Sequence, residues 1–248
     1  MKISRLAVYL ILPAVLFTGC AAPHGRNASD FESLTPEQIT DFKTLYGENC
    51  AGCHGAEGRG GAAIALANPV YLTIADDTVI RTVIAKGVPD TAMPAFAQSA
   101  GGMLTEAQID VLTKEIRSRW AQPGILNGVT PPSYGARLTR DAKRGEIAYK
   151  TYCESCHGPG GSGGQKGSAI TDPSYLALVS DQGLRTIVIT GRPELGAPDW
   201  RGNLPGKAMS DQEITDVVCW LRSRQPTTSP QPNSASNNSQ HQEPQNAK

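Results

Sequence analysis

Two short stretches of the sequence combine residue types that could do chemistry. Cys-Ala-Gly-Cys-His occupies residues 50–54, and Cys-Glu-Ser-Cys-His occupies residues 153–157, 103 positions later. In each stretch two thiols can add to the vinyl groups of one porphyrin, and the adjacent histidine reaches the iron from one face. C-x-x-C-H is the attachment signature of a c-type haem. It predicts two covalent haems, attached and ligated by Cys50, Cys53, His54, Cys153, Cys156 and His157.

Zinc binding and a redox dithiol are the alternatives to haem attachment. A structural zinc site gathers four ligands around one ion, whereas each cysteine pair here has its own adjacent histidine. A thioredoxin-like dithiol needs no following histidine and belongs in a βαβ pattern, which is absent here.

Met93 is the candidate for the opposite face of the first haem. It lies in a proline-containing turn, Ala-Met-Pro-Ala-Phe at residues 92–96, and follows His54 by 39 positions. A methionine in an apolar face would ordinarily fill a core. A thioether opposite a histidine raises the reduction potential of a haem iron. The location in a turn therefore predicts that Met93 is an iron ligand.

The second stretch lacks a methionine at the matching position, where Ala197 stands instead. Met209 is the candidate ligand there, because the segment from Ala197 to Met209 is long and could fold back over the distal face. Methionine is also unbranched and reaches far. The alternative is that Met209 takes the place of Leu104 and packs on the haem edge, which leaves the iron five-coordinate or bound to water.

An internal duplication surrounds the two stretches. Segments match at offsets of 103 to 105 residues across about 80 residues, which is the signature of a repeat. The matches pair Tyr46 with Tyr149, Asn68–Leu72 with Asp172–Leu176, Ile80–Thr82 with Leu184–Thr186, and Ile116–Arg119 with Leu221–Arg224. We call residues 35–120 the first repeat and residues 137–226 the second repeat.

Capping signals predict the helices that position these residues. Thr35-Pro36-Glu37-Gln38 predicts a helix that begins at Thr35 and runs toward Gly47. Residues 76–86 predict a short amphipathic helix that Gly87 ends. Thr105 begins the last helix of the first repeat, and Ser210 begins the corresponding helix of the second repeat.

Composition limits the size of an apolar core and excludes some functions. Aromatic residues make up 6% of the chain, and glycine and proline together supply 44 residues, so a haem would provide much of the apolar material. The formal net charge is zero, which gives no sign of nucleic-acid binding. The first repeat has 7 basic and 10 acidic residues and the second has 12 and 10. The basic excess of the second could steer an acidic partner or be an ordinary solvated surface.

The ends of the chain carry targeting and linking signals. Residues 1–19 have a positive start and a short apolar run, which predicts a cleaved export signal. The segment ends in Phe-Thr-Gly-Cys, at residues 17–20, which resembles a bacterial lipoprotein cleavage box and predicts lipidation of Cys20, although Phe17 replaces the usual Leu. We expect a tether at 20–34, a linker at 121–136 and a disordered tail at 227–248.

Each repeat resembles a class I cytochrome c domain in its order of N-terminal helix, C-x-x-C-H, middle helix, methionine loop and C-terminal helix. The resemblance implies an all-α fold of two consecutive domains, each a few short helices around a covalent haem. It implies a periplasmic electron carrier, either a shuttle or a respiratory-complex subunit. The implied partners are a quinol-oxidising complex, a terminal oxidase or another cytochrome, with the membrane reached through a lipid anchor.

A carrier is preferred to an enzyme because acid and base groups are scarce. The chain has four histidines, of which His54 and His157 are expected iron ligands, while His24 and His241 lie in segments expected to be mobile. A catalytic haem needs an open position and groups that act on substrate. The alternatives are a haem oxidoreductase or peroxidase, or a gas-binding sensor, using an open second haem.

Overall fold

Helices and loops make up residues 34–225, which are the residues that this computed structural model describes. Within that range, β-pairing is limited to isolated bridges between Ala97 and Leu104 and between Arg192 and Ala197. The predicted all-α fold class is confirmed. The expected export signal, most of the tether and the tail lie outside the described residues, as do Cys20, His24 and His241.

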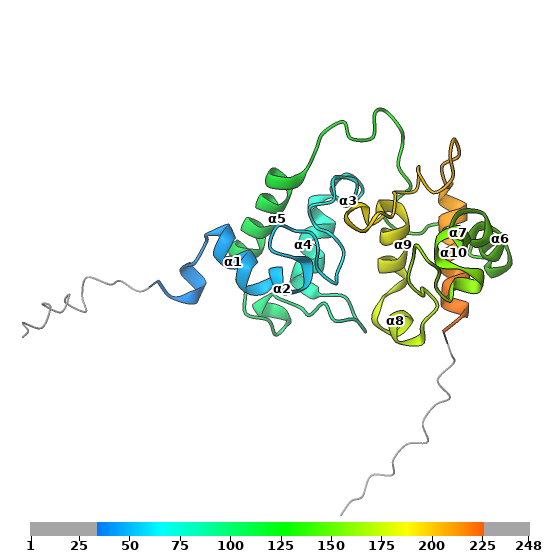
Figure 1. Cartoon of the computed structure of the whole chain (residues 1–248). Coiled ribbons are helices and arrows are strands. Elements are labelled where there is room, and N and C mark those ends of the chain that lie inside the picture. The colour runs from blue at the N-terminus through cyan, green and yellow to red at the C-terminus, as the bar shows by residue number, and fades with distance from the viewer. Residues whose placement is uncertain (1–33, 226–248) are drawn as a thin grey trace, which may run out of the picture. The chain divides into compact units, whose positions relative to one another are not determined.

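The α-helices of the two repeats follow one another in the same order, which confirms the internal duplication, whereas the 3-10 helices η2 and η4 have no counterpart in the other repeat (Figure 1). The first repeat contains η2 (Pro36–Gln38), α1 (Phe42–Asn49), α2 (Ala51–His54), α3 (Pro69–Ile74), α4 (Asp77–Lys86), η3 (Gln98–Ala100) and α5 (Glu106–Trp120). The second contains α6 (Ala142–Tyr152), α7 (Glu154–His157), η4 (Pro159–Gly161), α8 (Pro173–Leu178), α9 (Asp181–Thr190), η5 (Pro193–Leu195) and α10 (Asp211–Ser223).

Helix α1 begins six residues later than the sequence predicts, comparing the observed N-cap with the predicted one. Its N-cap is Asp41, whose carboxylate accepts the Thr44 N–H at 2.8 Å, so the predicted start at Thr35 is wrong. The Gln108 amide donates to the carbonyls of Pro36 and Ile39, at 2.7 and 2.9 Å. Those bonds hold the segment before Asp41 as a 3-10 turn against α5.

The other predicted caps are confirmed. Asp76 caps α4 through the Val79 N–H, and Gly87 follows its last residue. Thr105 and Ser210 form complete capping boxes at the starts of α5 and α10. Side chains at both helix starts therefore satisfy backbone N–H groups that have no partner within the helix.

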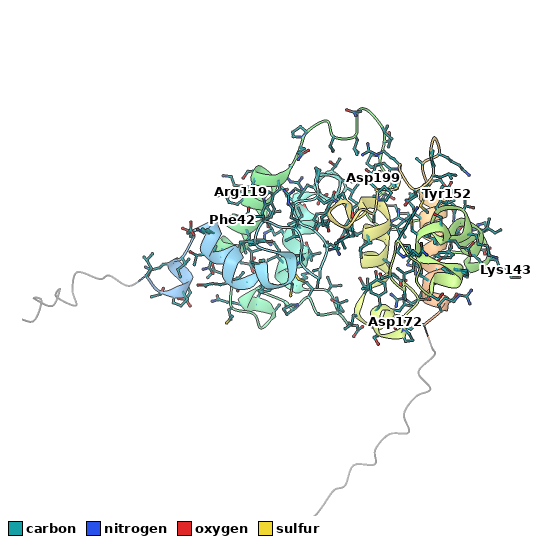
Figure 2. All side chains as sticks on the ribbon, in the orientation of Figure 1. Phe42, Arg119, Lys143, Tyr152, Asp172 and Asp199 are labelled. Carbon is teal, nitrogen blue, oxygen red and sulfur yellow. The ribbon has the colours of Figure 1, made fainter. Side chains whose placement is uncertain are left out.

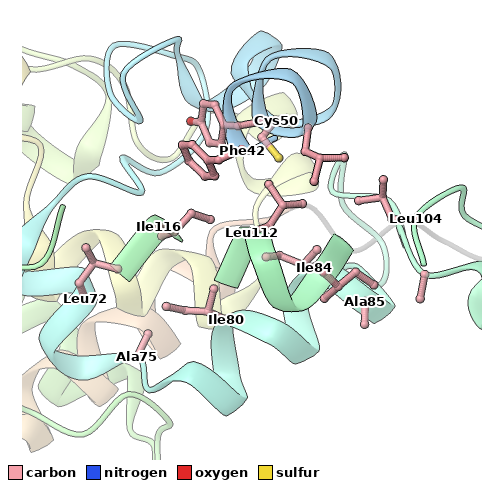
Figure 3. Close-up of a cluster of buried hydrophobic side chains, with 14 of the residues drawn as sticks. Phe42, Cys50, Leu72, Ala75, Ile80, Ile84, Ala85, Leu104, Leu112 and Ile116 are labelled. Atoms are coloured by element: carbon pink, nitrogen blue, oxygen red, sulfur yellow. The ribbon is translucent and has the colours of Figure 1, made fainter. Parts of the chain in front are cut away.

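The core of the first repeat is built on α5. Ile109, Leu112 and Ile116 share one face of this helix and are at most 1% exposed. Figure 3 shows Leu112 and Ile116 between the segment that carries Cys50 and the α4 side chain Ile80. This apolar face of α5 packs against α1, the helix that leads into the first C-x-x-C-H stretch.

The crossing of the first and last helices differs between the repeats. In the first, Phe42 of α1 stacks on Tyr46 with ring centroids 5.3 Å apart. The Arg119 guanidinium lies 4.6 Å from the Phe42 centroid, and both of these residues are labelled in Figure 2. In the second, the matching residue is Gly145, where a Cβ would lie 2.0 Å from the Asp216 carbonyl oxygen. Helix α6 can thus approach α10 more closely than a larger residue would permit.

A duplicated arginine joins each last helix to the turn before the middle helix. Arg117 of α5 and Arg222 of α10 each donate to two backbone carbonyls and pair with a carboxylate at the start of the middle helix. The acceptors are Leu72, Ala75 and Asp77 in the first repeat, and Leu176, Val179 and Asp181 in the second. Both arginines therefore fix the same corner of the fold.

The linker at 121–136 ends against the second repeat. The buried Arg185 guanidinium donates to the carbonyls of Ser133 and Tyr134 at 2.8 to 3.1 Å. The repeats also contact each other directly, because the Asn68 amide donates to the Thr190 carbonyl at 3.1 Å. The bounds expected for two separate domains stay a prediction.

We expect Gly145→Ala to lower the free energy of unfolding of the haem-containing protein. Overpacking costs about 1–3 kcal/mol, which exceeds the gain of about 0.5–1 kcal/mol from replacing a helical glycine. The control is Gly47→Ala in α1, where a Cβ has no atom within 4 Å, and which should stabilise the protein. Urea unfolding measures both variants, and equal effects would contradict the tight crossing.

Candidate functional site

The two C-x-x-C-H stretches adopt the same short helical turn. Cys50 ends α1 and Cys153 ends α6, each with φ of −120°, and the following residues form α2 and α7. The His54 N–H donates to the Cys50 carbonyl at 3.0 Å, and the His157 N–H donates to the Cys153 carbonyl at 2.9 Å. Residues three and four positions apart share one face of a helix. Both cysteines and the histidine of each stretch therefore lie on one side of the turn.

A backbone carbonyl about ten residues later holds each histidine ring. His54 Nδ1 lies 2.8 Å from the Ile64 carbonyl oxygen, and His157 Nδ1 lies 2.9 Å from the Ser168 carbonyl oxygen. A carbonyl oxygen only accepts, so Nδ1 carries the proton and Nε2 keeps its lone pair. Burial lowers the pKa of His54, against the opposing effect of the Ile64 bond. Each ring is thus set to bind a metal through Nε2.

The loops that return these carbonyls need glycine for close approach. A Cβ at Gly167 would lie 2.8 Å from His157 Nδ1. A Cβ at Gly61 would lie 2.1 Å from the Cys53 carbonyl oxygen. The glycines after each C-x-x-C-H stretch therefore permit the backbone to pass directly beside the turn.

A tyrosine holds the other end of each turn. The Tyr46 hydroxyl donates to the Gly55 carbonyl at 2.9 Å, and the Tyr149 hydroxyl donates to the Gly158 carbonyl. Burial is the largest cause that raises the pKa of Tyr149, to about 12, which keeps this donor protonated. The internal duplication matches these two tyrosines to each other, but no motif in the sequence predicts a function for them.

The cysteines are free thiols that fit thioether formation. Burial raises the pKa of Cys50 and of Cys153 to about 12, with a smaller contribution from the second cysteine of each pair. Among residues 34–225, no group of three or more His, Cys, Asp or Glu side chains is arranged to hold a metal ion. The described residues thus offer no zinc site. Two thiols and one imidazole on a common face fit a covalent haem.

Met93 lies on the loop that follows α4. Its carbonyl accepts the Val88 N–H at 3.0 Å, and its N–H donates to the Thr91 hydroxyl at 3.2 Å. A Cβ at Gly87 would lie 2.7 Å from the Met93 carbonyl oxygen. The turn is therefore held closely against the end of α4, and Met93 is half-buried.

Ala197 has the backbone position of Met93 in the second repeat. The Ala197 carbonyl accepts the Arg192 N–H at 3.0 Å, and a Cβ at Gly191 would lie 2.7 Å from the same carbonyl oxygen. These contacts match those of Met93 with Val88 and Gly87. The two loops therefore share the bond that closes them against the preceding helix, although the Ala197 N–H donates to the Arg192 carbonyl where the Met93 N–H donates to the Thr91 hydroxyl. The second loop has no thioether at this position.

Met209 has the backbone position of Leu104. The Met209 N–H donates to the Trp200 carbonyl at 2.9 Å, as the Leu104 N–H does to the Phe96 carbonyl at 2.7 Å. Their side chains are buried alike, at 2% and 5% exposure. The Asn203 amide nitrogen lies 3.7 Å from the Met209 sulfur, as a donor.

Comparisons with known proteins agree with this geometry. A family model described as cytochrome c oxidase, cbb3-type, subunit III matches residues 37–114 and 140–221. The cbb3-type cytochrome c oxidase subunit FixP of Bradyrhizobium diazoefficiens is 30% identical over 177 residues, which cover 65% of this chain and 54% of that protein. A cytochrome bc1 complex cytochrome c subunit of Mycobacterium bovis is 24% identical over 182 residues, which cover 73% of this chain and 61% of that protein.

The chain thus spans about half the length of FixP and about three fifths of the mycobacterial subunit. A chain of the Kuenenia stuttgartiensis reducing HAO-like protein complex, Kustc0457/Kustc0458, aligns with 78% of this chain over its own full length. That alignment has 21% identity and a TM-score of 0.42.

We expect Tyr149→Phe to reduce the free energy of unfolding by about 0.5–1.5 kcal/mol, because the buried Gly158 carbonyl loses one of its two donors and keeps the Gly161 N–H. The control is Tyr175→Phe in α8, because the Tyr175 hydroxyl forms no hydrogen bond to the described residues. Chemical denaturation of the haem-containing variants measures the difference. Equal losses in the two variants would show that the Tyr149 hydroxyl does not support the turn.

Proposed function

The chain belongs to the cbb3-type cytochrome c oxidase subunit III family of cytochromes, and on that basis we propose that it carries electrons between respiratory proteins. Its cofactors are two covalently attached haem c groups, which exchange one electron each at iron. Cys50, Cys53, Cys153 and Cys156 would form the thioethers, with His54 and His157 as the proximal ligands and Met93 as the distal ligand of the first haem. The observation that carries this proposal is the matched histidine geometry of the two repeats.

The residues of each turn have separate tasks in electron carriage. The thioethers fix the macrocycle on the helical turn, and the Nδ1 bonds of His54 and His157 fix the ring orientation. Fixed ligands limit the rearrangement that accompanies a change of iron charge. Met93 raises the potential of its haem, since a thioether favours the reduced iron.

A carrier fits the described residues better than an enzyme. His54 and His157 are the histidines between residues 34 and 225, and both have Nδ1 bound to a carbonyl and Nε2 assigned to iron. Neither is available for proton transfer to a substrate. The partners we propose are a quinol-oxidising complex, a terminal oxidase or another cytochrome. The names of FixP and of the mycobacterial bc1 subunit support this set.

We expect the purified protein to contain two haems per chain that survive denaturation, and the double variant Cys153→Ala/Cys156→Ala to contain one. Cys219→Ala is the matched control, because Cys219 is a free, half-buried cysteine of α10 outside both stretches. It should keep two haems. Haem absorbance per chain and intact mass measure the content.

The same preparation tests electron carriage. We expect reversible reduction of both haems and no turnover of hydrogen peroxide with a reduced donor. Retention of two haems in the double variant would refute the attachment sites, and sustained peroxide turnover would favour the oxidoreductase alternative.

We also propose that the chain is exported and anchored at the periplasmic face of a bacterial membrane through lipid on Cys20. Between residues 34 and 225, no helix has the length and hydropathy needed to span a bilayer. The proposal of a lipid anchor is based on the Phe-Thr-Gly-Cys sequence at residues 17–20, which resembles a lipoprotein cleavage box. Several acyl chains hold a protein firmly, whereas one chain holds it marginally.

We expect Cys20→Ser to release a haem-containing protein into the soluble periplasmic fraction, while the unchanged protein needs detergent. Cys219→Ser is the control, since it changes a cysteine far from the cleavage box and should remain in the membrane. Fractionation followed by haem staining measures both. Membrane retention of Cys20→Ser would contradict lipid anchoring at this residue.

A further inference from the structure

We propose that the distal side of the second haem is a binding site for a small neutral gas molecule, because neither Ala197 nor Met209 supplies an iron ligand there. The inference rests on the proposed haem attachment at Cys153 and Cys156. It chooses between the two interpretations that the sequence left open for Met209. Three features of the described residues carry it.

The first feature is the loop that should provide the ligand. Ala197 and Met93 accept the same backbone bond, at 3.0 Å in both repeats, from the residue that follows the glycine at the helix end. A methyl group offers no lone pair to a metal. The second repeat thus keeps the loop that presents a ligand and lacks the ligand itself.

The second feature is the location of Met209. Its backbone bond to Trp200 repeats the bond of Leu104 to Phe96, so the chain does not fold back to bring residue 209 to the place of residue 197. The Met209 side chain is 2% exposed within the second core cluster. Its sulfur also lies within reach of the Asn203 amide, which engages the sulfur lone pair.

The third feature is that the neighbouring cationic side chains already have partners. Arg201 forms a bidentate pair with Asp199, from Nε to Oδ1 and from Nη2 to Oδ2, and stacks on Trp200 with its guanidinium carbon 4.9 Å from the ring centroid. Lys207 lies over the Tyr152 ring, at 5.4 Å. No nitrogen donor of these side chains replaces the missing thioether.

The surroundings of Ala197 select the kind of ligand. Ala197, Pro198 and the buried Trp200 are apolar. The nearby guanidinium groups of Arg192 and Arg201 are paired with the carboxylates of Glu194 and Asp199. Such a site gives little stabilisation to an anion, because no free charge faces it. A small neutral molecule that binds reduced iron, such as carbon monoxide or nitric oxide, fits this chemistry.

Carbon monoxide binding to the reduced full-length protein tests the inference. We expect one carbon monoxide per chain, counted from the absorbance change against the total haem. Ala197→Met restores the thioether on the same loop and should reduce the count to zero. Met209→Leu should leave the count at one, because leucine occupies the matching position in the first repeat. Met93→Ala should raise the count to two and calibrates the signal of an opened haem.

Two results would overturn the inference. No binding in the unchanged protein, with one carbon monoxide in Met209→Leu, would make Met209 the ligand. One carbon monoxide in Ala197→Met, at unchanged haem content, would show that residue 197 does not face the iron. A haem content below two per chain would instead count against the proposed attachment, so the two proposals fail separately.

Discussion

The hydrogen bond from each histidine Nδ1 to a backbone carbonyl is the constraint on which the rest of each repeat depends. To bring Ile64 back beside His54, the chain must turn within ten residues, and it passes close to the Cys53 carbonyl at Gly61. Tyr46 holds the opposite end of the turn, so α1 must lie where its hydroxyl reaches Gly55. Each bond contributes about 1 kcal/mol, but together they fix the direction of Nε2, which is what a metal ligand requires.

The repeats preserve those bonds and differ where the haem environment is set. The tyrosine, the histidine and the arginine of the last helix keep their acceptors in both copies. The changes are Phe42 against Gly145 at the helix crossing, and Met93 against Ala197 on the distal loop. The order of the α-helices is the same in both repeats, while Gly145 permits a closer crossing of α6 and α10. Duplication has thus kept one scaffold while allowing two haem environments.

Local signals predicted much of this structure, and contacts between distant residues account for the rest. The capping boxes at Thr105 and Ser210 depend on residues three positions apart, which a sequence displays directly. The start of α1 depends on Gln108, about 70 residues away, and nothing near Thr35 signals that bond. The partners of His54 and His157 are backbone carbonyls, which every residue has. Likewise, Arg185 fixes the end of the linker through carbonyls that no motif marks.

Unequal distal sides would give the two haems different tasks. With Met93 as the ligand of the first iron and no thioether at the second, as proposed above, the first haem would have the higher reduction potential, because a thioether opposite histidine raises the potential of the iron. Electrons would then pass from the second repeat to the first. The second repeat has the basic excess and the first has the acidic excess, so charge complementarity would guide an acidic donor to the second and a basic acceptor to the first. A gas bound above Ala197 would stabilise reduced iron in the second repeat and slow electron transfer to the first.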